Sequence, residues 1–519
     1  MDTKYEADPE KPANDEQIGD IKFHLDDAKL ATSKEHGLTV LQGLKPYRKA
    51  IGWSVMLSMA VIMEGYDTTL VVDGVPSISA PWQAAGEHLT GRSSAFLGWE
   101  HSVPIVTNGA YIGEILGLQV TGYLVDWYGN KKVMTGATIL MIGFIALSFF
   151  GMSLGVQLAG QILCGIPWGV YQTVTTVYAA EVMPVNLRGY LTSIPFAVQW
   201  IWPIPLILVC ICPESPTWLV EHGRNEEAEK AVARLQSNTG VDIPAPHETV
   251  ALLAQTNAFE KELTAGVGYM ECFKGTNLRR TEITVGTWVA QQMCGPVLQT
   301  YAIYFFEQAG LPTAQAFNMT LGLVSVPPIF LVWADKLINP QYAIAFVGTV
   351  LSWPLINRFG RRTIYLWGMT GIVISLLLVG FISLAPVTSG SSWAIGAFLL
   401  VFTFIYDSTV RPLTYVIVPE TPSSRLRHKT VVLARNAYNI TCIWTGVLTP
   451  YMLNTTAWNW SAKTGFFWAG FAILCLIWAY FRIPETKGFT FSEIDVLFEE
   501  GVPARKFAAH RGEVAERIR

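Results

Sequence analysis

The chain has 519 residues, of which 51% are hydrophobic and only 15% are charged, whereas soluble domains carry about 25% charged residues. This shortage of charge excludes an ordinary soluble domain and indicates an integral membrane protein with many spans. The net charge of −4 does not by itself indicate a partner, and no nucleic-acid partner is expected.

Residues 1–47 are polar and are expected to form a cytoplasmic tail without a cleaved signal peptide. Runs long enough to cross a bilayer as helices, which takes about 20 residues, follow at 49–72, 105–125, 133–153, 156–180, 194–212, 283–306, 342–356, 363–386, 394–418, 431–453 and 464–482. We therefore divide the chain into the 1–47 tail, a helix bundle at 48–212, a cytoplasmic linker at 213–282, a second bundle at 283–483 and a cytoplasmic tail at 484–519.

Basic residues gather in alternate connections between these spans. They are Lys131, Lys132, Arg188, Arg279, Arg280, Arg358, Arg361, Arg362, Arg425, Arg427 and Lys429. Because short loops rich in Lys and Arg stay on the cytoplasmic side, these loops and both termini are expected to face the cytoplasm. The seven cysteines form no CxxC pair, so neither a metal site nor a disulfide framework is expected.

Four ionisable residues lie inside otherwise apolar runs: Glu64, Asp67, Glu114 and Arg435. A charge at the membrane centre costs about 2.5–3.5 kcal/mol on insertion scales, and such residues usually serve ions, protons or polar solutes. Glu64 and Asp67 are three residues apart and share a helix face. A carboxylate held between an apolar environment and a nearby cation can load and release a proton, and Arg435 is a suitable cation because guanidinium stays charged. The chain therefore reads as a transporter.

Two loops share a pattern of glycine followed by basic residues. Residues 122–132 (GYLVDWYGNKK) join the second and third spans, and residues 357–362 (NRFGRR) occupy a similar position in the second bundle. Their common spacing predicts two halves of similar build, as in transporters with internal repeats. Two unrelated basic turns are the alternative.

These loops resemble those of the major facilitator superfamily, in particular its sugar porters. The same likeness extends to 181–189 (EVMPVNLRG), 213–219 (PESPTWL), 291–295 (QQMCG) and 484–488 (PETKG). The stretches 64–69 (EGYDTT), 164–169 (CGIPWG) and 433–439 (LARNAYN) resemble the fungal α-glucoside (maltose-type) permeases. The resemblance implies an all-α integral membrane fold of two six-helix halves, acting in proton-coupled uptake of α-glucosides at the plasma membrane.

The resemblance also implies roles for single residues. Proton coupling would use the acids of the first two spans and the arginine: Glu64, Asp67, Glu114 and Arg435. The alternative for this group is a fixed ion-pair network that only holds helices together. For Glu114, close helix packing at Gly113 and Gly117 is a further reading.

Sugar hydroxyls need groups that both donate and accept, and amides do both. The candidates for substrate binding are Gln291, Gln292, Gln299, Tyr301, Tyr415, Asn436 and Asn439. Tyr415 falls where many sugar porters carry a tryptophan over the sugar. Each amide could instead join neighbouring helices.

Charged residues at the cytoplasmic helix ends form the gate that the resemblance implies. They are Asp126, Glu181, Arg188, Arg358, Arg361, Glu420 and Arg427. The alternative is ordinary interface charges that reach toward water.

The chain departs from the twelve-span pattern at two places. After residues 187–193 the sequence passes directly to a stretch, 194–203, that resembles the sixth helix, so the fifth helix is expected to be lacking. A link of a few residues cannot cross a core about 30 Å thick at about 3.6 Å per residue. Residues 323–340 form an anomalous apolar insert containing Pro327 and Pro328. A retained intron and an over-spliced exon would explain both.

Arg411 occupies a position where the family prefers a small glycine in a cavity-lining helix. This residue and the irregular spans keep other functions open: a sugar facilitator without proton coupling, a transporter-like sugar sensor, and an inactive product of a mis-spliced gene model. The expected partners are a small-molecule sugar, protons and membrane lipid, and the chain is expected to be a monomer. No residue set indicates an enzyme or a cofactor.

Overall fold

The computed structural model describes residue 34 and residues 45–54, 95–150, 154–182, 212–237, 243–264, 268–300, 340–386, 388–423, 426–453, 457–487, 489 and 491–510. All regular elements within these ranges are helices. The first bundle and the linker contain α4 (Ala95–Tyr128), α5 (Asn130–Phe150), α6 (Leu154–Val182), α9 (Pro216–Glu221), α10 (Asn225–Leu235), α11 (Pro246–Thr264) and η2 (Tyr269–Phe273).

The second bundle and the tail contain α12 (Gly275–Met293), α13 (Val297–Thr300), α17 (Pro340–Phe359), α18 (Arg361–Ile382), α19 (Ser389–Ser408), α20 (Val410–Glu420), α21 (Arg427–Leu453), η3 (Ser461–Lys463), α22 (Thr464–Arg482), α23 (Phe491–Glu499) and η4 (Ala504–His510). These helices overlap nine of the expected spans. The expected span at 194–212 and the insert at 323–340 lie almost wholly outside the described residues, as does most of the span at 49–72.

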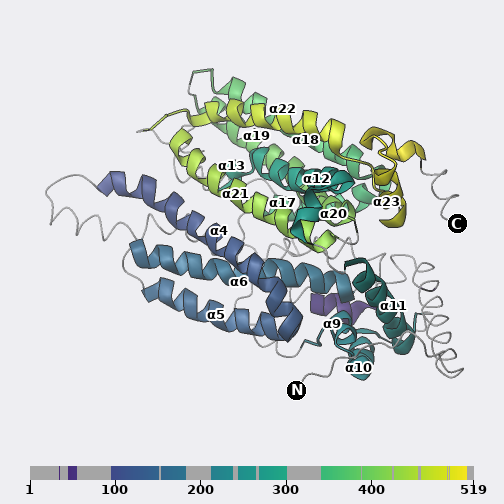
Figure 1. The fold of residues 1–519 in the computed structure, drawn as a ribbon. Coiled ribbons are helices and arrows are strands. Elements are labelled where there is room, and N and C mark those ends of the chain that lie inside the picture. Colours follow the sequence, from purple (N-terminus) through teal and green to yellow (C-terminus); the bar gives the residue numbers. More distant parts are fainter. Residues whose placement is uncertain are drawn as a thin grey trace, which may run out of the picture.

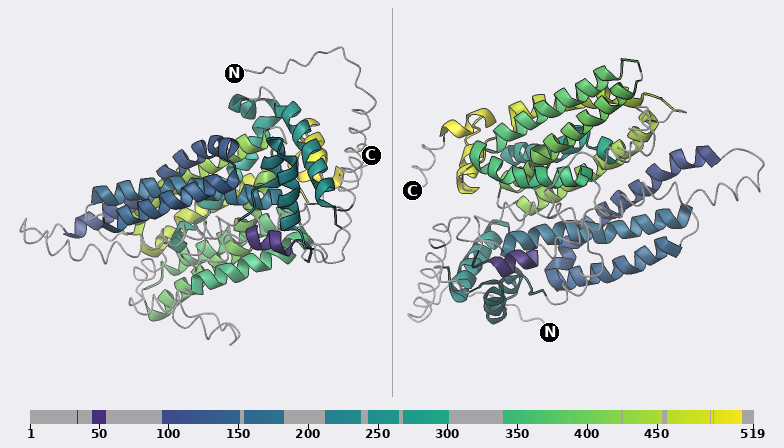
Figure 2. Two further views of the ribbon diagram at one scale, coloured as in Figure 1. Left: turned by 90° about the horizontal axis from the view of Figure 1, so that it is seen from below. Right: turned by 180° about the vertical axis from the view of Figure 1, so that it is seen from behind.

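The helices form two bundles that lie side by side, with α4 against α21 between them (Figures 1 and 2). The linker helices α9, α10 and α11 lie at the same end of the molecule as α23 (Figure 1). The two expected cytoplasmic segments outside the bundles are thus on one side.

Glycines bring α4 and α6 into direct backbone contact. A side chain at Gly113 or Gly117 would collide with the carbonyl oxygen of Ile162 or Ile166, and one at Gly165 would collide with that of Ala110. Small residues that let backbones approach closely are the usual means of packing helices in a membrane. This contact holds Glu114, which lies between the two glycines of α4, at the centre of the α4–α6 interface.

The second bundle has its own apolar core. Tyr365, Leu376, Phe402 and Trp468 are completely or almost completely buried there, and they come from α18, α19 and α22.

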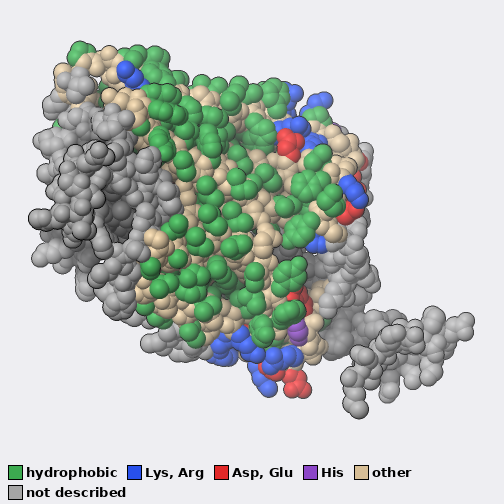
Figure 3. Space-filling model, turned by 60° about the vertical axis from the view of Figure 1, so that its left-hand side comes forward, with side chains coloured by type: hydrophobic (Ala, Val, Ile, Leu, Met, Phe, Trp, Pro, Cys, Tyr) green, Lys and Arg blue, Asp and Glu red, His purple; other side chains and the backbone are tan. Residues whose placement is uncertain are grey.

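On the surface of the molecule, apolar side chains cover the broad middle of one face, and charged side chains gather toward its edges (Figure 3).

Four of the described helical stretches are long and apolar enough to cross a membrane: Asn130–Ser148, Arg361–Ile382, Gly390–Glu420 and Ser461–Arg482. The helices α12 and α21 are less apolar than α18. They carry most of the polar side chains of the candidate site.

The two loops with the shared glycine pattern are built alike. Gly129 has φ of 86° and Gly360 has φ of 92°, a region that side chains disfavour. The carboxylate of Glu214 accepts the backbone N–H of Lys131 at 3.0 Å, and that of Glu485 accepts the N–H of Arg361 at 2.8 Å. Each glutamate thereby satisfies an unpaired N–H at the start of a helix.

The structure breaks two expected continuous spans. The span 283–306 is interrupted after Met293, because Gly295 has φ of 100° and Pro296 lacks an N–H. The span 394–418 is divided at Thr409, which has φ of −128° and ψ of −80°. Pro412 explains this second break, since its ring would clash with the carbonyl of Ser408 in a continuous helix.

Candidate functional site

The facing sides of α12 and α21 form the centre of the candidate site. The side-chain amide of Gln292 donates a hydrogen bond to the hydroxyl of Thr445 at 3.2 Å. One turn earlier on α12, the ring of Trp288 lies 4.8 Å from that of Tyr415 and 5.0 Å from that of Tyr438, both edge to face. Three helices therefore supply one aromatic cluster, since Tyr415 belongs to α20.

Arg435 lies over this cluster. Its guanidinium carbon is 4.9 Å from the centre of the Trp288 ring and 4.5 Å from that of the Tyr438 ring. A cation over an aromatic face is attracted by about 0.5–2 kcal/mol, more when water is excluded. The two rings thus hold the guanidinium in place at the α12–α21 boundary.

Several amides near this cluster have unused hydrogen-bonding atoms among the described residues. They include Oε1 of Gln291, Oδ1 of Asn436, and both polar side-chain atoms of Asn439. Gln291 is 2% exposed and Asn439 is completely buried. An unpaired buried polar group costs about 1–3 kcal/mol, so these atoms are suited to a polar solute that satisfies them.

A second charged group lies on α19 and α20. Arg411 Nη1 is 2.8 Å from Oδ1 of Asp407, and the Asp407 side chain is only 1% exposed. The side chain of Gln299 approaches Asp407, and that of Gln291 approaches the hydroxyl of Tyr406. Gln299 of α13 therefore lies beside this ion pair, and Gln291 of α12 lies beside the preceding residue, Tyr406.

Glu114 lies in the other bundle, on α4. It is 1% exposed, and its Oε1 accepts a hydrogen bond from the amide of Gln172 at 2.7 Å. The tight α4–α6 packing fits the reading of Glu114 as part of a close helix contact. The same burial also suits a proton-carrying carboxylate.

At the expected cytoplasmic end, Arg361 and Glu420 form an ion pair at 3.1 Å. The hydroxyl of Thr486 donates to the other oxygen of Glu420 at 2.5 Å. This group joins α18 and α20 of the second bundle to the segment that follows α22. It therefore links helices of one half and does not bridge the two halves.

The remaining expected gate residues that the structure describes lie at other helix ends. Asp126 is exposed, and its backbone carbonyl accepts a hydrogen bond from the indole of Trp218 at 3.4 Å. Arg358 is exposed near the end of α17, and Arg427 begins α21. Glu181 lies near the end of α6, and its side chain is outside the described part of the structure.

Four expected site residues lie outside the described residues: Glu64, Asp67, Tyr301 and Arg188. The structure therefore brings together only the second-bundle part of the expected site. Tyr415 and Arg435 meet at Trp288, Gln292 bonds Thr445 on the facing helix, and Gln299 lies near Asp407.

Three contributors were missed at the level of sequence: Trp288, Asp407 and Glu485. Asp407 could have been found, because it lies four residues before Arg411 in an apolar stretch, the spacing of an ion pair on a helix. Trp288 lies three residues before Gln291 and shares its helix face. The contact of Glu485 with α18 spans 124 residues and has no local signal.

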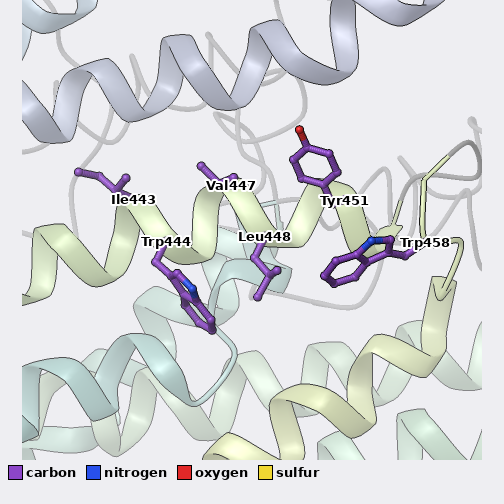
Figure 4. Close-up of a pocket in the computed structure, with 6 residues that line it drawn as sticks. All are labelled: Ile443, Trp444, Val447, Leu448, Tyr451 and Trp458. Atoms are coloured by element: carbon purple, nitrogen blue, oxygen red, sulfur yellow. The ribbon is translucent and has the colours of Figure 1, made fainter.

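A separate apolar hollow of about 280 Å³ lies at the far end of α21, lined by Ile443, Trp444, Val447, Leu448, Tyr451 and Trp458 (Figure 4). Its lining contains none of the expected sugar-binding residues. The hollow is therefore distinct from the polar site around Trp288.

Comparison with known proteins gives a consistent result. The family model described as "Sugar (and other) transporter" matches residues 53–194 and 193–498. The general alpha-glucoside permease of Saccharomyces cerevisiae (strain ATCC 204508 / S288c) is 37% identical, over 93% of this chain and 81% of its own. Maltose permease MAL61 of Saccharomyces cerevisiae is 35% identical, over 95% of this chain and 83% of its own.

Among solved structures, the proton:xylose symporter XylE bound to 6-bromo-6-deoxy-D-glucose superposes with a TM-score of 0.65 and 19% identity, covering 87% of this chain and 99% of that one. The inward open conformation of XylE from E. coli gives a TM-score of 0.62 at 18% identity, covering 86% and 99%. At this identity the likeness shows the fold alone, which is that of the major facilitator superfamily.

Proposed function

Because the chain belongs to the sugar transporter family, whose model matches residues 53–194 and 193–498, we propose that it carries α-glucosides such as maltose into the cell together with protons. Membership makes it a membrane transporter and not an enzyme. The choice of α-glucosides rests on the printed names of its relatives, a general alpha-glucoside permease and a maltose permease. The plasma membrane is the proposed location.

The observation that carries the proposal is the polar and aromatic face shared by α12 and α21. Gln291 and Asn439 are buried with unsatisfied amide atoms, which suits a ligand with many hydroxyl groups. The ring of Tyr415, packed against Trp288, suits the apolar face of a glucosyl unit. We assign Gln291, Gln292, Gln299, Asn436 and Asn439 to sugar binding, with Tyr301 as a further candidate outside the described residues.

For proton coupling we propose Glu64, Asp67 and Glu114 as the acids and Arg435 as the cation. Support comes from Glu114, which is buried and hydrogen bonded by Gln172, and from Arg435, which is held at the aromatic cluster. A proton would bind an acid on the outer side and leave on the inner side as the two halves rock about the sugar. In this scheme the Arg361–Glu420 pair keeps the second half rigid at its cytoplasmic end.

We also propose that the chain lacks the equivalent of a fifth helix. The two stretches matched by the family model meet at residues 193–194, the position at which the sequence passes from the fourth to the sixth expected span. An over-spliced exon at this point and a retained intron at residues 323–340 would account for both irregularities, and sequencing the transcript across the two points tests this explanation. A message that reads straight through both points as given would contradict it.

The function itself is tested by uptake of labelled maltose in yeast cells that lack their own α-glucoside permeases, with external pH recorded. Uptake that raises the external pH supports proton symport, whereas uptake at constant pH identifies a facilitator. Binding without uptake would indicate a sensor, and neither binding nor uptake would indicate an inactive product.

A pair of variants locates the sugar site. Gln291→Ala removes a buried amide and is expected to lower uptake at least about tenfold, the equivalent of 1.4 kcal/mol. Gln119→Ala changes an exposed amide on α4 and is expected to keep the parent rate. Equal uptake by both variants would exclude the α12 face as the binding site.

A further inference from the structure

An ion pair lies within an apolar stretch of the second bundle, outside the residues assigned above. Arg411 Nη1 is 2.8 Å from Asp407 Oδ1, and both residues belong to the candidate membrane-spanning stretch Gly390–Glu420. Charged residues inside such a stretch are costly and are usually functional. The ion pair is therefore expected to have a functional role in addition to helix packing.

The two side chains bridge the break between α19 and α20. Thr409, the residue at the break, lies midway between them and has non-helical φ and ψ of −128° and −80°. Its hydroxyl donates to the carbonyl of Ile405 at 2.5 Å. The Asp407–Arg411 contact thus fixes the direction of the Arg411 side chain at a point where the backbone is not a regular helix.

The environment of the two partners differs. The Asp407 side chain is 1% exposed, whereas the Arg411 side chain is 33% exposed although it is surrounded by the helices of the bundle. Asp407 is approached by Gln299, and Arg411 lies near Tyr406 and Tyr415. The partly exposed Arg411 side chain is therefore next to residues to which the proposed function assigns sugar binding.

We propose that Arg411 is a sugar-contacting residue that donates hydrogen bonds to two neighbouring hydroxyl oxygens of a glucosyl unit, and that Asp407 is the positioning residue that holds its guanidinium. The proposal rests on the proposed function and adds a determinant of substrate specificity to it. The guanidinium is planar and presents its donors as a rigid fork, which matches two adjacent hydroxyl groups better than a single ammonium does.

Specificity follows from the same geometry. A site built to hydrogen bond a hydroxyl rejects an analogue without that hydroxyl, because its own polar groups are then left unpaired. Arg411 should therefore make the transporter discriminate against glucosides that lack one hydroxyl of the contacted neighbouring pair. Loss of the fork should reduce that discrimination more than it reduces transport of the complete sugar.

The experiment measures inhibition of labelled maltose uptake by methyl α-glucoside and by analogues in which each hydroxyl is removed in turn. In the parent protein, removal of either of two neighbouring hydroxyls should weaken inhibition at least about tenfold. The relevant ratio is the inhibition constant of the deoxy analogue divided by that of methyl α-glucoside. Arg411→Lys keeps the charge beside Asp407 but loses the fork, and it should bring this ratio close to one. Arg482→Lys, an exposed ion-paired arginine on α22, is the control and should keep the parent ratio.

A neutral double variant, Asp407→Asn with Arg411→Gln, keeps the proposal testable if the single variant is not delivered to the membrane. Its ratio should also fall close to one. A parent ratio retained by either Arg411 variant would overturn this inference alone, because maltose uptake would still be present. Absence of maltose uptake and binding in the parent protein would overturn the proposed function and this inference with it.

Discussion

The side-chain amide of Gln172 on α6 donates a hydrogen bond to the carboxylate of Glu114 on α4, with 2.7 Å between Nε2 and Oε1. Glu114 is 1% exposed, and the backbones around it touch the opposite helix at Gly165 and Gly169. The position of the carboxylate is therefore fixed by a rigid helix pair. This arrangement allows the proton-carrying role proposed for Glu114 to be separated from its packing role.

Replacement of Glu114 by glutamine should uncouple transport without unfolding the protein. Glutamine has nearly the same shape and can still accept the hydrogen bond from Gln172, but it binds no proton. We expect normal amounts of protein in the membrane, retained exchange of labelled maltose, and loss of accumulation above the external concentration. Accumulation equal to that of the parent would exclude Glu114 as a coupling residue.

Gln172→Ala is the complementary variant. It removes a hydrogen bond to a charged group, worth about 1.5–3 kcal/mol, and leaves the carboxylate in place. The melting temperature of the purified protein should fall while maltose uptake still raises the external pH. If Gln172→Ala abolished the rise in external pH without lowering the melting temperature, it would contradict the assignment of Gln172 to helix packing.

A side chain larger than hydrogen should not be tolerated at Gly165. Gly165→Val would push against the carbonyl oxygen of Ala110 and the backbone of Gly113, and overpacking of this kind costs about 1–3 kcal/mol. The melting temperature in detergent should fall accordingly. Gly136→Val on α5 is the matched control, because an added Cβ there meets nothing within 4 Å; equal shifts for both would show that α4 and α6 are not in close contact.

The two glutamates that bind helix N-termini should have similar effects on stability. Glu214→Ala and Glu485→Ala each remove the acceptor of a backbone N–H, at Lys131 and Arg361. Loss of such a cap costs about 0.5–2 kcal/mol, so both variants should melt earlier than the parent. Glu229→Ala, at an exposed position of α10, should have the same melting temperature as the parent. An unchanged melting temperature in all three variants would argue against capping.

The contact between Lys34 and Glu248 should depend on pH. Burial would raise the pKa of Glu248, but hydrogen bonds from the Ala245 N–H and the Lys34 ammonium outweigh it and hold the pKa below its ordinary value. A lowered folded-state pKa contributes stability above the ordinary pKa of about 4.3. This contribution is lost as pH falls through the lower folded-state value.

The parent protein should therefore melt above the Glu248→Gln variant at neutral pH, and the difference should vanish on acidification. Glu226→Gln, at an exposed position, serves as the control and should show no such difference. A gap between parent and Glu248→Gln that widens toward acid would contradict the assignment.

Much of the fold could be predicted from the amino-acid sequence. The apolar runs predicted nine of the described spans, but α4 begins at Ala95 where residue 105 was expected, and α12 begins at Gly275 where residue 283 was expected. The common Gly129 and Gly360 pattern predicted two related loops, which the structure builds alike. The breaks after Met293 and at Thr409 were missed. Both lie near prolines, at Pro296 and Pro412, so hydrophobicity alone was given too much weight.

The site was less predictable because its contacts join distant segments. A charge in an apolar run singled out Glu114 and Arg435, but the sequence does not show that Arg435 rests on Trp288, which lies on another helix. Asp407 was overlooked because Arg411 was considered alone. The helix-capping role of Glu214 depends on a contact across 83 residues, which no periodicity reveals.

The segment after α22 folds back onto the beginning of α12. Arg280 pairs with Asp495, and Ile283 packs with Leu497, Phe498 and Phe507. The same helix carries Gln291 two to three turns further on. Residues 491–510 are consequently packed against the helix to which we assign sugar binding, and a fluorophore attached near residue 510 would report the tilt of that helix during turnover.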